Sequence, residues 1–366
     1  MSDIAITVQT ITEIDAHPNA DRLEIVKILG TQCVTGVGDH TPGEKVLYFP
    51  ADMMIPEGVA EKLGVKKYLK HVRWNGKKVQ SRIAACRLRG VPSFGFVIPC
   101  DQRMEVDTDV TAIYQGEKYE PPEVMPKLPG IKGGRRFHLE PGEFTMYTNI
   151  QHYWRYPGVF SEFGDDEQVV ITEKIHGTNS RVGVLFEGDE WVYAAGSHKV
   201  RWMQCNEAFR YWRPLDNEGM LSMLAELCGE CANVIVFGEI YGSSVQDMDY
   251  GVDGDEGYRV FDISVNGTYL DWDSVTRFCN QHGVTVVPVL YQGPWKCVSE
   301  VIDQYSSGRT CVGKSRGKFK DREGIVIKPV MERLTDKIGG SRQPHRAIVK
   351  YVSADYLDRK GAQDNA

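Results

Sequence analysis

Runs of branched and aromatic hydrophobic residues, separated by Gly, Asp and Pro, fill the first hundred residues of this chain. Such runs are typical of short strands, and the separating residues are typical of turns. About five short strands in roughly 100 residues suit a small β-barrel. The predicted strands are residues 8–11, 23–29, 32–37, 45–50 and 95–99.

Longer apolar runs in the second half carry polar residues at or near their ends. In the run at 323–328, alternation places Ile325 and Ile327 on one face and Lys328 on the other. Residues 149–156 predict a short helix before the first of these runs. The predicted strands are residues 168–172, 181–186, 234–242, 258–263, 323–328 and 347–352, with a helix at 221–227.

Two of the polar positions indicate chemistry. Lys174 follows a predicted strand and precedes a turn at Gly177. A lysine held at such a turn can neutralise a phosphate or, once deprotonated, attack one. Glu239 ends an apolar strand, where a carboxylate needs a metal, a ribose hydroxyl or a cation as its partner. A solvated lysine on a hairpin and a structural glutamate are the alternative interpretations.

The segment 174–179, Lys-Ile-His-Gly-Thr-Asn, resembles the nucleotidyl-acceptor motif of the covalent nucleotidyltransferases, which include polynucleotide ligases and mRNA capping enzymes. Their usual motif is Lys-x-Asp-Gly, and His176 in place of the Asp resembles the RNA ligase branch. The resemblance implies that Lys174 is the nucleophile and that His176 orients groups or handles protons in later steps. It also implies that Glu173 and Asn179 contact the nucleotide.

Further segments resemble the other family motifs, in the same order along the chain. The resemblance implies that Glu239 contacts the nucleotide sugar and a metal, and that Glu323 has a similar role. It implies that Phe261 lies against adenine and that Asp262 organises the site. Lys328 would support phosphate chemistry. Stacking on an aromatic ring contributes about 1–3 kcal/mol per base, although a core position is the alternative for Phe261.

The last motif departs from the family pattern of Lys-x-Lys. Ile348 stands where the first Lys is expected, and Lys350 occupies the second position. The residues that could supply the missing charge are Arg346 and His345. Only Lys350 is therefore expected to act as this motif does in the family.

A weaker match follows the predicted strand near residue 196, where the family has a basic residue that contacts the nucleotide or the 5′-phosphate. Lys199 and Arg201 both fit this position. The spacing does not choose between them, so both are expected near the nucleotide.

The reaction that the resemblance implies has three steps. Lys174 attacks the α-phosphate of ATP, which gives lysyl-AMP and pyrophosphate. The AMP passes to a 5′-phosphate on a polynucleotide, and a 3′-hydroxyl then attacks that phosphate and releases AMP. Nearby cations would lower the lysine pKa from its ordinary value of ~10.4. Oxygen ligands from Glu239 and Glu323 suit Mg²⁺ or Mn²⁺.

The N-terminal half carries two signatures of its own. Residues 17–23, His-Pro-Asn-Ala-Asp-Arg-Leu, resemble the tRNA-binding type of OB-fold domain, and residues 87–95 resemble a segment of RNA ligases that bear an N-terminal OB-like domain. This order of domains resembles the Deinococcus RNA ligase-like group, which implies a nicked RNA or RNA/DNA duplex as the substrate, with RNA on the 3′-OH side. An α+β chain is expected: an OB-like barrel at 1–100, a linker at 101–145, and a nucleotidyltransferase domain of antiparallel sheets with flanking helices at 146–360.

The net charge of −7 does not indicate a nucleic-acid binder, but the charge is unevenly distributed. Residues 62–89 contain ten Lys or Arg, no Asp or Glu, and interleaved aromatic residues. Cations with aromatic rings offer phosphate neutralisation and stacking surfaces. This segment is therefore a candidate nucleic-acid surface, with a solvated basic face as the alternative.

Other features limit the partners and the location. No apolar run reaches the roughly 20 residues of a membrane-spanning helix, and no signal peptide is evident. An intracellular location, in a cell or a virus-infected cell, is therefore expected, and nine scattered cysteines suggest reduced thiols. A monomer is also expected. Two rival functions remain: a GTP-dependent capping guanylyltransferase, and an inactive ligase-like protein that only binds RNA.

Overall fold

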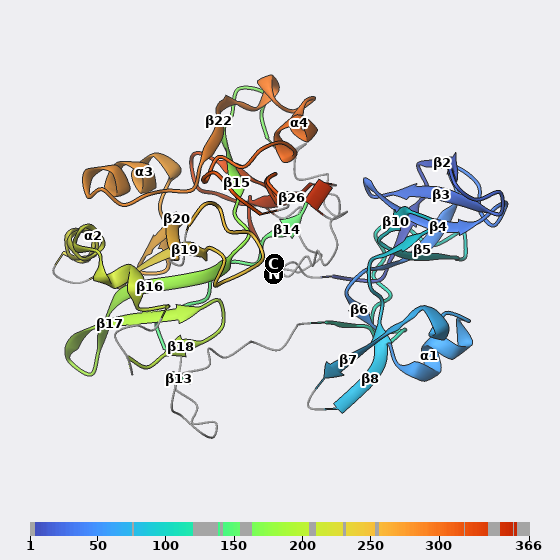
Figure 1. The fold of residues 1–366 in the computed structure, drawn as a ribbon, viewed down its shortest axis with the longest axis horizontal. Coiled ribbons are helices and arrows are strands. Elements are labelled where there is room, and N and C mark those ends of the chain that lie inside the picture. The colour runs from blue at the N-terminus through green and yellow to red at the C-terminus, as the bar shows by residue number, and fades with distance from the viewer. Residues whose placement is uncertain are drawn as a thin grey trace. The chain divides into compact units, whose positions relative to one another are not determined.

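The computed structural model describes residues 4–74, 77–119, 138–139, 142–153, 163–204, 210–229, 232–252, 256–317, 319–335, 345–353 and 355–356. The described residues up to 119 form one compact unit, and those from 138 onward form a second (Figure 1). The α+β class expected from the sequence is confirmed, because both units are rich in strands and carry few helices.

The first unit consists of short strands and one α-helix, and it contains all five predicted strands. It contains three sheets, with the strand orders β1-β5-β11, β2-β3-β4 and β12-β6-β8-β7, and a separate two-stranded hairpin, β9-β10. The elements are β1 Thr7–Thr10, β2 Glu13–Ala16, β3 Leu23–Ile28, β4 Thr31–Gly36, β5 Lys45–Pro50, β6 Met53–Met54, α1 Glu57–Lys62, β7 Lys70–Trp74, β8 Lys77–Arg82, β9 Cys86–Leu88, β10 Val91–Ser93, β11 Gly95–Pro99 and β12 Glu117–Lys118.

Strand β5 is at the centre of this unit because it is buried on both faces. Leu47 and Phe49 belong to one apolar cluster, while Val46 and Tyr48 belong to another. The Phe49 ring stacks on Phe96 of β11 with their centroids 4.7 Å apart. An apolar run without polar alternation is therefore explained by a strand that lies between two small cores.

The two N-terminal signature segments lie together. The His17 ring Nε2 lies 3.0 Å from the Leu88 carbonyl oxygen, and the Asn19 side-chain amide donates to the Arg89 carbonyl oxygen at 3.0 Å. Arg89 and Gly90 both have positive φ, at 47° and 91°, so this turn is tight. The His-Pro-Asn segment thus fixes the hairpin that carries exposed arginines.

The candidate basic surface is partly neutralised. Lys66 Nζ lies 2.6 Å from Glu57 Oε1 and 2.5 Å from Glu61 Oε1, both on α1. Glu57 and Glu61 lie before residue 62, so the charge count over residues 62–89 did not include them. Residues 101–119, expected as the start of the linker, pack within the first unit, where Val110 is buried and β12 pairs with β6. The rest of the proline-rich segment, 120–130, lies outside the described residues.

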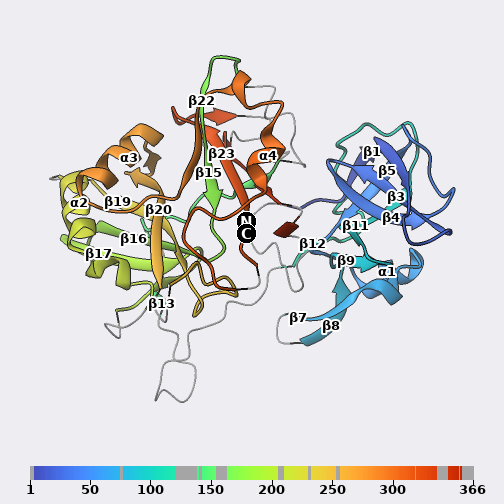
Figure 2. The same ribbon diagram turned by 45° about the horizontal axis from the view of Figure 1, so that its top comes forward.

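The second unit is built on two sheets. A seven-stranded antiparallel sheet has the order β13-β18-β17-β16-β19-β20-β21, and a five-stranded sheet has the order β14-β26-β23-β15-β22. Helices α2 and α3 pack on the larger sheet, and α4 packs beside β23 (Figures 1 and 2). The strands and α-helices are β13 His138–Leu139, β14 Gln151–His152, β15 Gln168–Lys174, β16 Thr178–Glu187, β17 Glu190–Ser197, β18 Arg201–Trp202, α2 Glu218–Cys228, β19 Val234–Tyr241, β20 Gly257–Val265, β21 Thr268–Tyr269, α3 Trp272–Gln281, β22 Val289–Pro294, α4 Ile302–Ser306, β23 Gly324–Pro329, β24 Leu334–Thr335, β25 His345–Arg346 and β26 Val349–Val352.

The expected helix at 149–156 is wrong over its described residues. Gln151 and His152 form β14, which pairs in parallel with Val349 and Lys350 of β26. This pairing joins residues that are far apart in sequence, and no local pattern reports it. Alternation along β23 is as predicted, since Ile325 and Ile327 lie in an apolar cluster on the outer face of the small sheet.

The chain passes from the small sheet to the large sheet through residues 175–177. A Cβ placed on Gly177 would lie 2.1 Å from the Ile240 carbonyl oxygen and 2.9 Å from Glu239 Cγ. The turn therefore packs directly against β19, and only glycine fits there. This close approach brings the end of β15 against the Glu239 strand.

The substitution Gly177→Ala should lower the free energy of unfolding by about 1–3 kcal/mol, because its methyl group would overlap the backbone of β19. Urea unfolding followed by fluorescence measures this change. Gly164→Ala is the matched control, since a Cβ there meets no atom closer than Glu167 Cβ at 4.0 Å. Equal stability of the two variants would show that the turn does not pack as described.

Candidate functional site

The ion pair of Lys174 and Glu323 lies at the centre of the site. Lys174 ends β15 and pairs in register with Gly324 of β23, which has no side chain to obstruct it. Its Nζ lies 2.7 Å from Glu323 Oε1, and the side chains are 13% and 3% exposed. The other carboxylate oxygen, Glu323 Oε2, is buried without a hydrogen-bond partner among the described residues. One buried glutamate thus holds the lysine and keeps an oxygen available for a further ligand.

A second carboxylate approaches from the larger sheet. Glu239 of β19 pairs in register with Asn179 of β16, and the Gly177 N–H hydrogen bonds to its carboxylate. Burial raises the pKa of Glu239 to about 8, with the Lys174 cation opposing this rise and the Glu323 charge adding to it. The Asn179 Oδ1 atom is buried without a hydrogen-bond partner in the described part of the chain.

His176 is held from both sides of its ring. Its Nε2 lies 2.9 Å from Asp247 Oδ1, and its Nδ1 lies 2.9 Å from the Tyr356 hydroxyl and 3.7 Å from Glu323 Oε2. The backbone N–H of His176 donates to the Tyr250 hydroxyl oxygen at 2.7 Å. With a proton on Nε2 donated to Asp247, Nδ1 can accept from Tyr356. Sequence reasoning missed Asp247, Tyr250 and Tyr356, which belong to none of the recognised motifs.

The remaining motif lysines lie on the same face of the small sheet as Lys174. Along β23 this face carries Gly324, Val326 and Lys328, and Val326 pairs in register with Lys350 of β26. Both lysines are buried, at 4% and 1% exposure. Strand alternation therefore gathers three lysines on one face, as positive charge for an anionic ligand.

Asp262 holds Lys328 rather than standing open to a ligand. Its Oδ1 accepts from Lys328 Nζ at 2.7 Å, and its Oδ2 accepts from the Tyr147 hydroxyl at 2.7 Å and from Arg346 at 3.0 Å. Burial would raise the pKa of Asp262, but the Arg346 and Lys328 cations outweigh it and lower that pKa. Burial lowers the pKa of Lys328, and Asp262 opposes this.

Ile348, which stands where the family motif has its first Lys, packs among apolar side chains. Ile348 lies in a buried cluster with Tyr147 and Phe237. Arg346, a candidate for the missing charge, is bonded to Asp262 and to Glu332, with its NH2 group 2.6 Å from Glu332 Oε2. The structure thus places the Arg346 charge in the network that holds Lys328, and His345 in the short strand β25.

Of three further expected nucleotide contacts, two side chains, those of Glu173 and Arg201, are bonded to other protein groups. Glu173 precedes Lys174 on β15 and so points to the opposite face, where its carboxylate accepts from Thr310 Oγ1 and from the Cys311 N–H. Arg201 is buried and makes a two-pronged pair with Glu187. Lys199 remains exposed. Of the two basic candidates, only Lys199 keeps a solvent-exposed side chain.

Phe261 lies at a β-bulge in β20, where the register shifts opposite Phe237 and Gly238. Its ring is half-buried, and its centroid lies 4.8 Å from that of Tyr147. Its carbonyl oxygen accepts from Lys328 Nζ at 3.3 Å. Phe261 thus borders the lysine face and is a partly buried residue.

The two carboxylates fit a divalent cation. Among the residues that the structure describes, no group of three or more His, Cys, Asp or Glu side chains could hold a metal unaided. Mg²⁺ is usually bound by one or two carboxylates together with substrate phosphates. Glu239 and Glu323, one with a buried and unpaired oxygen, suit that arrangement.

Comparison with known proteins agrees with this site. A family model described as RNA ligase matches residues 167–352, and an OB-fold domain model matches residues 5–100. No curated protein sequence matches the chain. No helix in the described residues is long and apolar enough to cross a membrane.

Structures of Naegleria gruberi RNA ligase share the fold along the whole chain. A variant with AMP and Mn has 22% identity and a TM-score of 0.72, covering 98% of this chain and 99% of that one. A variant with ATP and Mn has 22% identity and a TM-score of 0.71, covering 97% and 100%. A variant without ligand has 22% identity and a TM-score of 0.70, covering 97% of each chain.

The raised pKa of Glu239 predicts a pH-dependent stability. Between the usual value of 4.5 and about 8, the folded protein holds a proton that the unfolded chain releases, so stability falls as pH rises. Glu239→Gln removes this loss. The free energy of unfolding of the Glu239→Gln variant, minus that of the unmodified protein, should increase from about pH 5 to about pH 8 and then stay constant.

Urea unfolding in a metal chelator at several pH values measures this gain. Glu187→Gln is the control, because the Arg201 hydrogen bond lowers the pKa of Glu187 and its effect should stay constant above about pH 5. A gain for Glu239→Gln that does not change with pH would contradict the assignment.

Proposed function

Because this chain belongs to the RNA ligase family, we propose that it joins RNA ends with ATP through a nucleotide bound covalently to Lys174. The observation that carries the proposal is the partly buried Lys174 near Glu323 and Glu239, on the face that also presents Lys328 and Lys350. The Naegleria structures that contain ATP, AMP and Mn support the choice of nucleotide and of a divalent metal.

In the first step, Lys174 Nζ attacks the α-phosphorus of ATP, the N–P bond forms, and pyrophosphate leaves. Lysine must first lose a proton, because the ammonium form has no free electron pair. Glu323 Oε1, at 2.7 Å, is placed to take that proton. When bound, a divalent cation held by Glu239 and Glu323 would neutralise phosphate charge. Lys328 and Lys350 add positive charge on the same face.

In the second step, a 5′-phosphate oxygen of the RNA attacks the AMP phosphorus, and Lys174 Nζ leaves. In the third, a 3′-hydroxyl oxygen attacks the 5′-phosphorus, and AMP leaves. His176 lies next to Lys174 and is fixed by Asp247 and Tyr356, so its position suits proton handling in these later steps. The half-buried ring of Phe261 would stack on adenine.

The substrate we propose is a 3′-OH/5′-phosphate nick in a duplex, with RNA on the 3′-OH side, acted on by a monomer. The OB-fold unit supports a role in holding RNA. Its hairpin β9-β10 exposes Arg87 and Arg89, and His17 and Asn19 fix the backbone of that hairpin. Two exposed arginines on a rigid turn suit contacts with phosphates.

The substitution Lys174→Ala should abolish covalent labelling by ATP carrying a labelled α-phosphate, because no nucleophile remains. Label retained on denatured protein, with Mg²⁺ or Mn²⁺ present, is the measurement. Lys296→Ala, which removes an exposed lysine that pairs with Asp166 outside the motifs, is the control and should keep the adduct. Labelling by GTP alone would move the protein to the capping class, and a label that survives Lys174→Ala would refute the proposed nucleophile.

Tyr356→Phe should slow the sealing of pre-adenylylated RNA about tenfold, because one hydrogen bond to His176 is lost, at about 1–1.5 kcal/mol. Single-turnover sealing rates measure the effect. The control is Tyr305→Phe, a half-buried tyrosine that packs on Tyr291. If both variants seal at the same rate, the Tyr356 hydroxyl does not position His176.

A further inference from the structure

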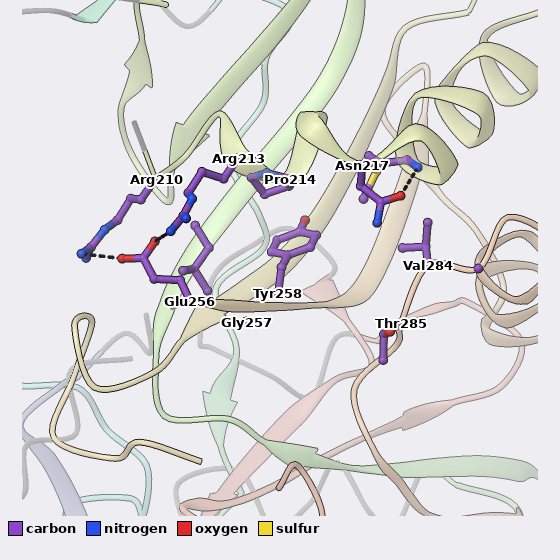
Figure 3. A pocket seen from close by; sticks show the side chains of 12 residues that line it. Arg210, Arg213, Pro214, Asn217, Glu256, Gly257, Tyr258, Val284 and Thr285 are labelled. Carbon is purple, nitrogen blue, oxygen red and sulfur yellow. Dashed lines mark hydrogen bonds and ion pairs between the residues drawn. The ribbon is translucent and has the colours of Figure 1, made fainter. Parts of the chain in front are cut away.

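The two faces of the larger sheet differ in their charged groups. Ile240 lines a pocket on one face, and its neighbour Glu239 points to the other. At the pocket, two arginines lie against the single carboxylate of Glu256 (Figure 3). These arginines are thus paired within the protein, on the side of β19 opposite to the candidate site.

A loop with several cations lies on the other face, which carries the candidate site. Arg259 of β20 pairs in register with Glu239 of β19, and residues paired in this way point to the same side of a sheet. The Arg259 guanidinium donates to the Val312 carbonyl oxygen at 3.2 Å. The loop that contains Val312 therefore lies on the side of the sheet to which Glu239 points.

Residues 309–317 and 319–320 form this basic loop, which lies between α4 and β23. Its two ends are held together, because the Thr310 N–H donates to the Lys320 carbonyl oxygen at 3.2 Å. Three residues beyond its end, the chain reaches Glu323, which pairs with Lys174. A compact loop with a closed base is thus joined directly to the carboxylate that holds the proposed nucleophile.

Tyr250 packs against both the basic loop and the turn of His176. Its hydroxyl oxygen accepts from the His176 N–H at 2.7 Å, and a Cβ placed on Gly313 would lie 2.1 Å from its carbonyl oxygen. Beside it, the Asp249 carboxylate accepts from the Arg316 N–H at 3.0 Å. The residue that fixes the backbone of His176 therefore also supports the loop, which places the loop at the edge of the site.

The basic loop presents charge to solvent. Its exposed cations are Arg309, Lys314, Arg316 and Lys320. Arg309 pairs with Asp321 at 3.5 Å. Within the part of the chain that the structure describes, neither Lys314 nor Lys320 forms an ion pair with a carboxylate. Two lysine charges on a fixed backbone are thus left for a ligand.

We propose that the basic loop binds the phosphodiester backbone of the RNA beside the nick and acts in the sealing step. Exposed lysines along a loop suit an extended polyanion, because each ammonium contacts a phosphate as a point charge and releases counterions. A compact anion such as pyrophosphate favours an enclosed site, where the buried Lys328 and Lys350 already offer cations. This inference rests on the proposed function, which supplies the RNA.

Lys314→Gln and Lys320→Gln test the proposal in the full chain. The matched control is Arg277→Gln, which removes an exposed cation of α3 that forms no ion pair among the described residues. Steady-state sealing of a pre-adenylylated RNA nick should show KM about fivefold higher for each loop variant and kcat within about twofold, as expected for one lost phosphate contact. The salt slope of RNA binding should fall by about one. Lys314→Arg, which keeps the charge, should restore both quantities.

Covalent labelling of Lys174 by ATP should be unchanged in the loop variants, which also shows that they fold. A sealing KM equal to that of Arg277→Gln would overturn the proposal. So would a raised KM for ATP in the labelling reaction with sealing unchanged, because the loop would then bind the phosphates of ATP. A KM that rises for one RNA sequence but not for another would contradict a contact to the backbone.

Failure of the proposed function is distinct from failure of this inference. Wild-type protein would then form no adduct at Lys174, whereas the salt slope of RNA binding still compares Lys314→Gln with Arg277→Gln. An equal salt slope for these two variants would reject the loop as an RNA contact, whether or not the protein seals RNA.

Discussion

The site depends on the placement of a lysine at the junction of two sheets, in a position with little access to solvent. Lys174 ends a strand of the small sheet, and three residues later the chain enters the large sheet with Gly177 packed on the backbone of β19. Burial makes an unpaired ammonium unfavourable, so Glu323 must accompany it. Burial also raises the pKa of Glu239, which adds a second carboxylate from the other sheet.

Along the strands of the small sheet, side chains that form the site and side chains that support the fold lie on opposite faces. On β15, Lys174 faces the large sheet, whereas Glu173 faces outward and ties down the loop at 310–311. On β23, Lys328 faces inward and is held by Asp262, while Ile325 and Ile327 form the outer core. Neighbouring motif residues thus have different tasks because successive side chains point to opposite faces.

Much of the fold was readable from the sequence, because branched residues between turn formers define the strands of both units. The motif order also located Lys174, Glu239 and Glu323, which the structure brings together. The direction in which a side chain points was harder to predict, because a motif does not reveal that Arg201 is paired with Glu187. Partners from distant segments could not be predicted, since Tyr356 reaches His176 across 180 residues. The same reason explains the error at 149–156, where parallel pairing with β26 forms a strand.

The central claim is that Lys174 itself carries the nucleotide. Peptide mass spectrometry of protein incubated with ATP and Mn²⁺ and then denatured tests it most directly. The account predicts an added AMP on the peptide that contains Lys174, linked through nitrogen and therefore lost on mild acid treatment. An AMP found on another residue, or a folded protein that carries no AMP with either metal, would contradict the account.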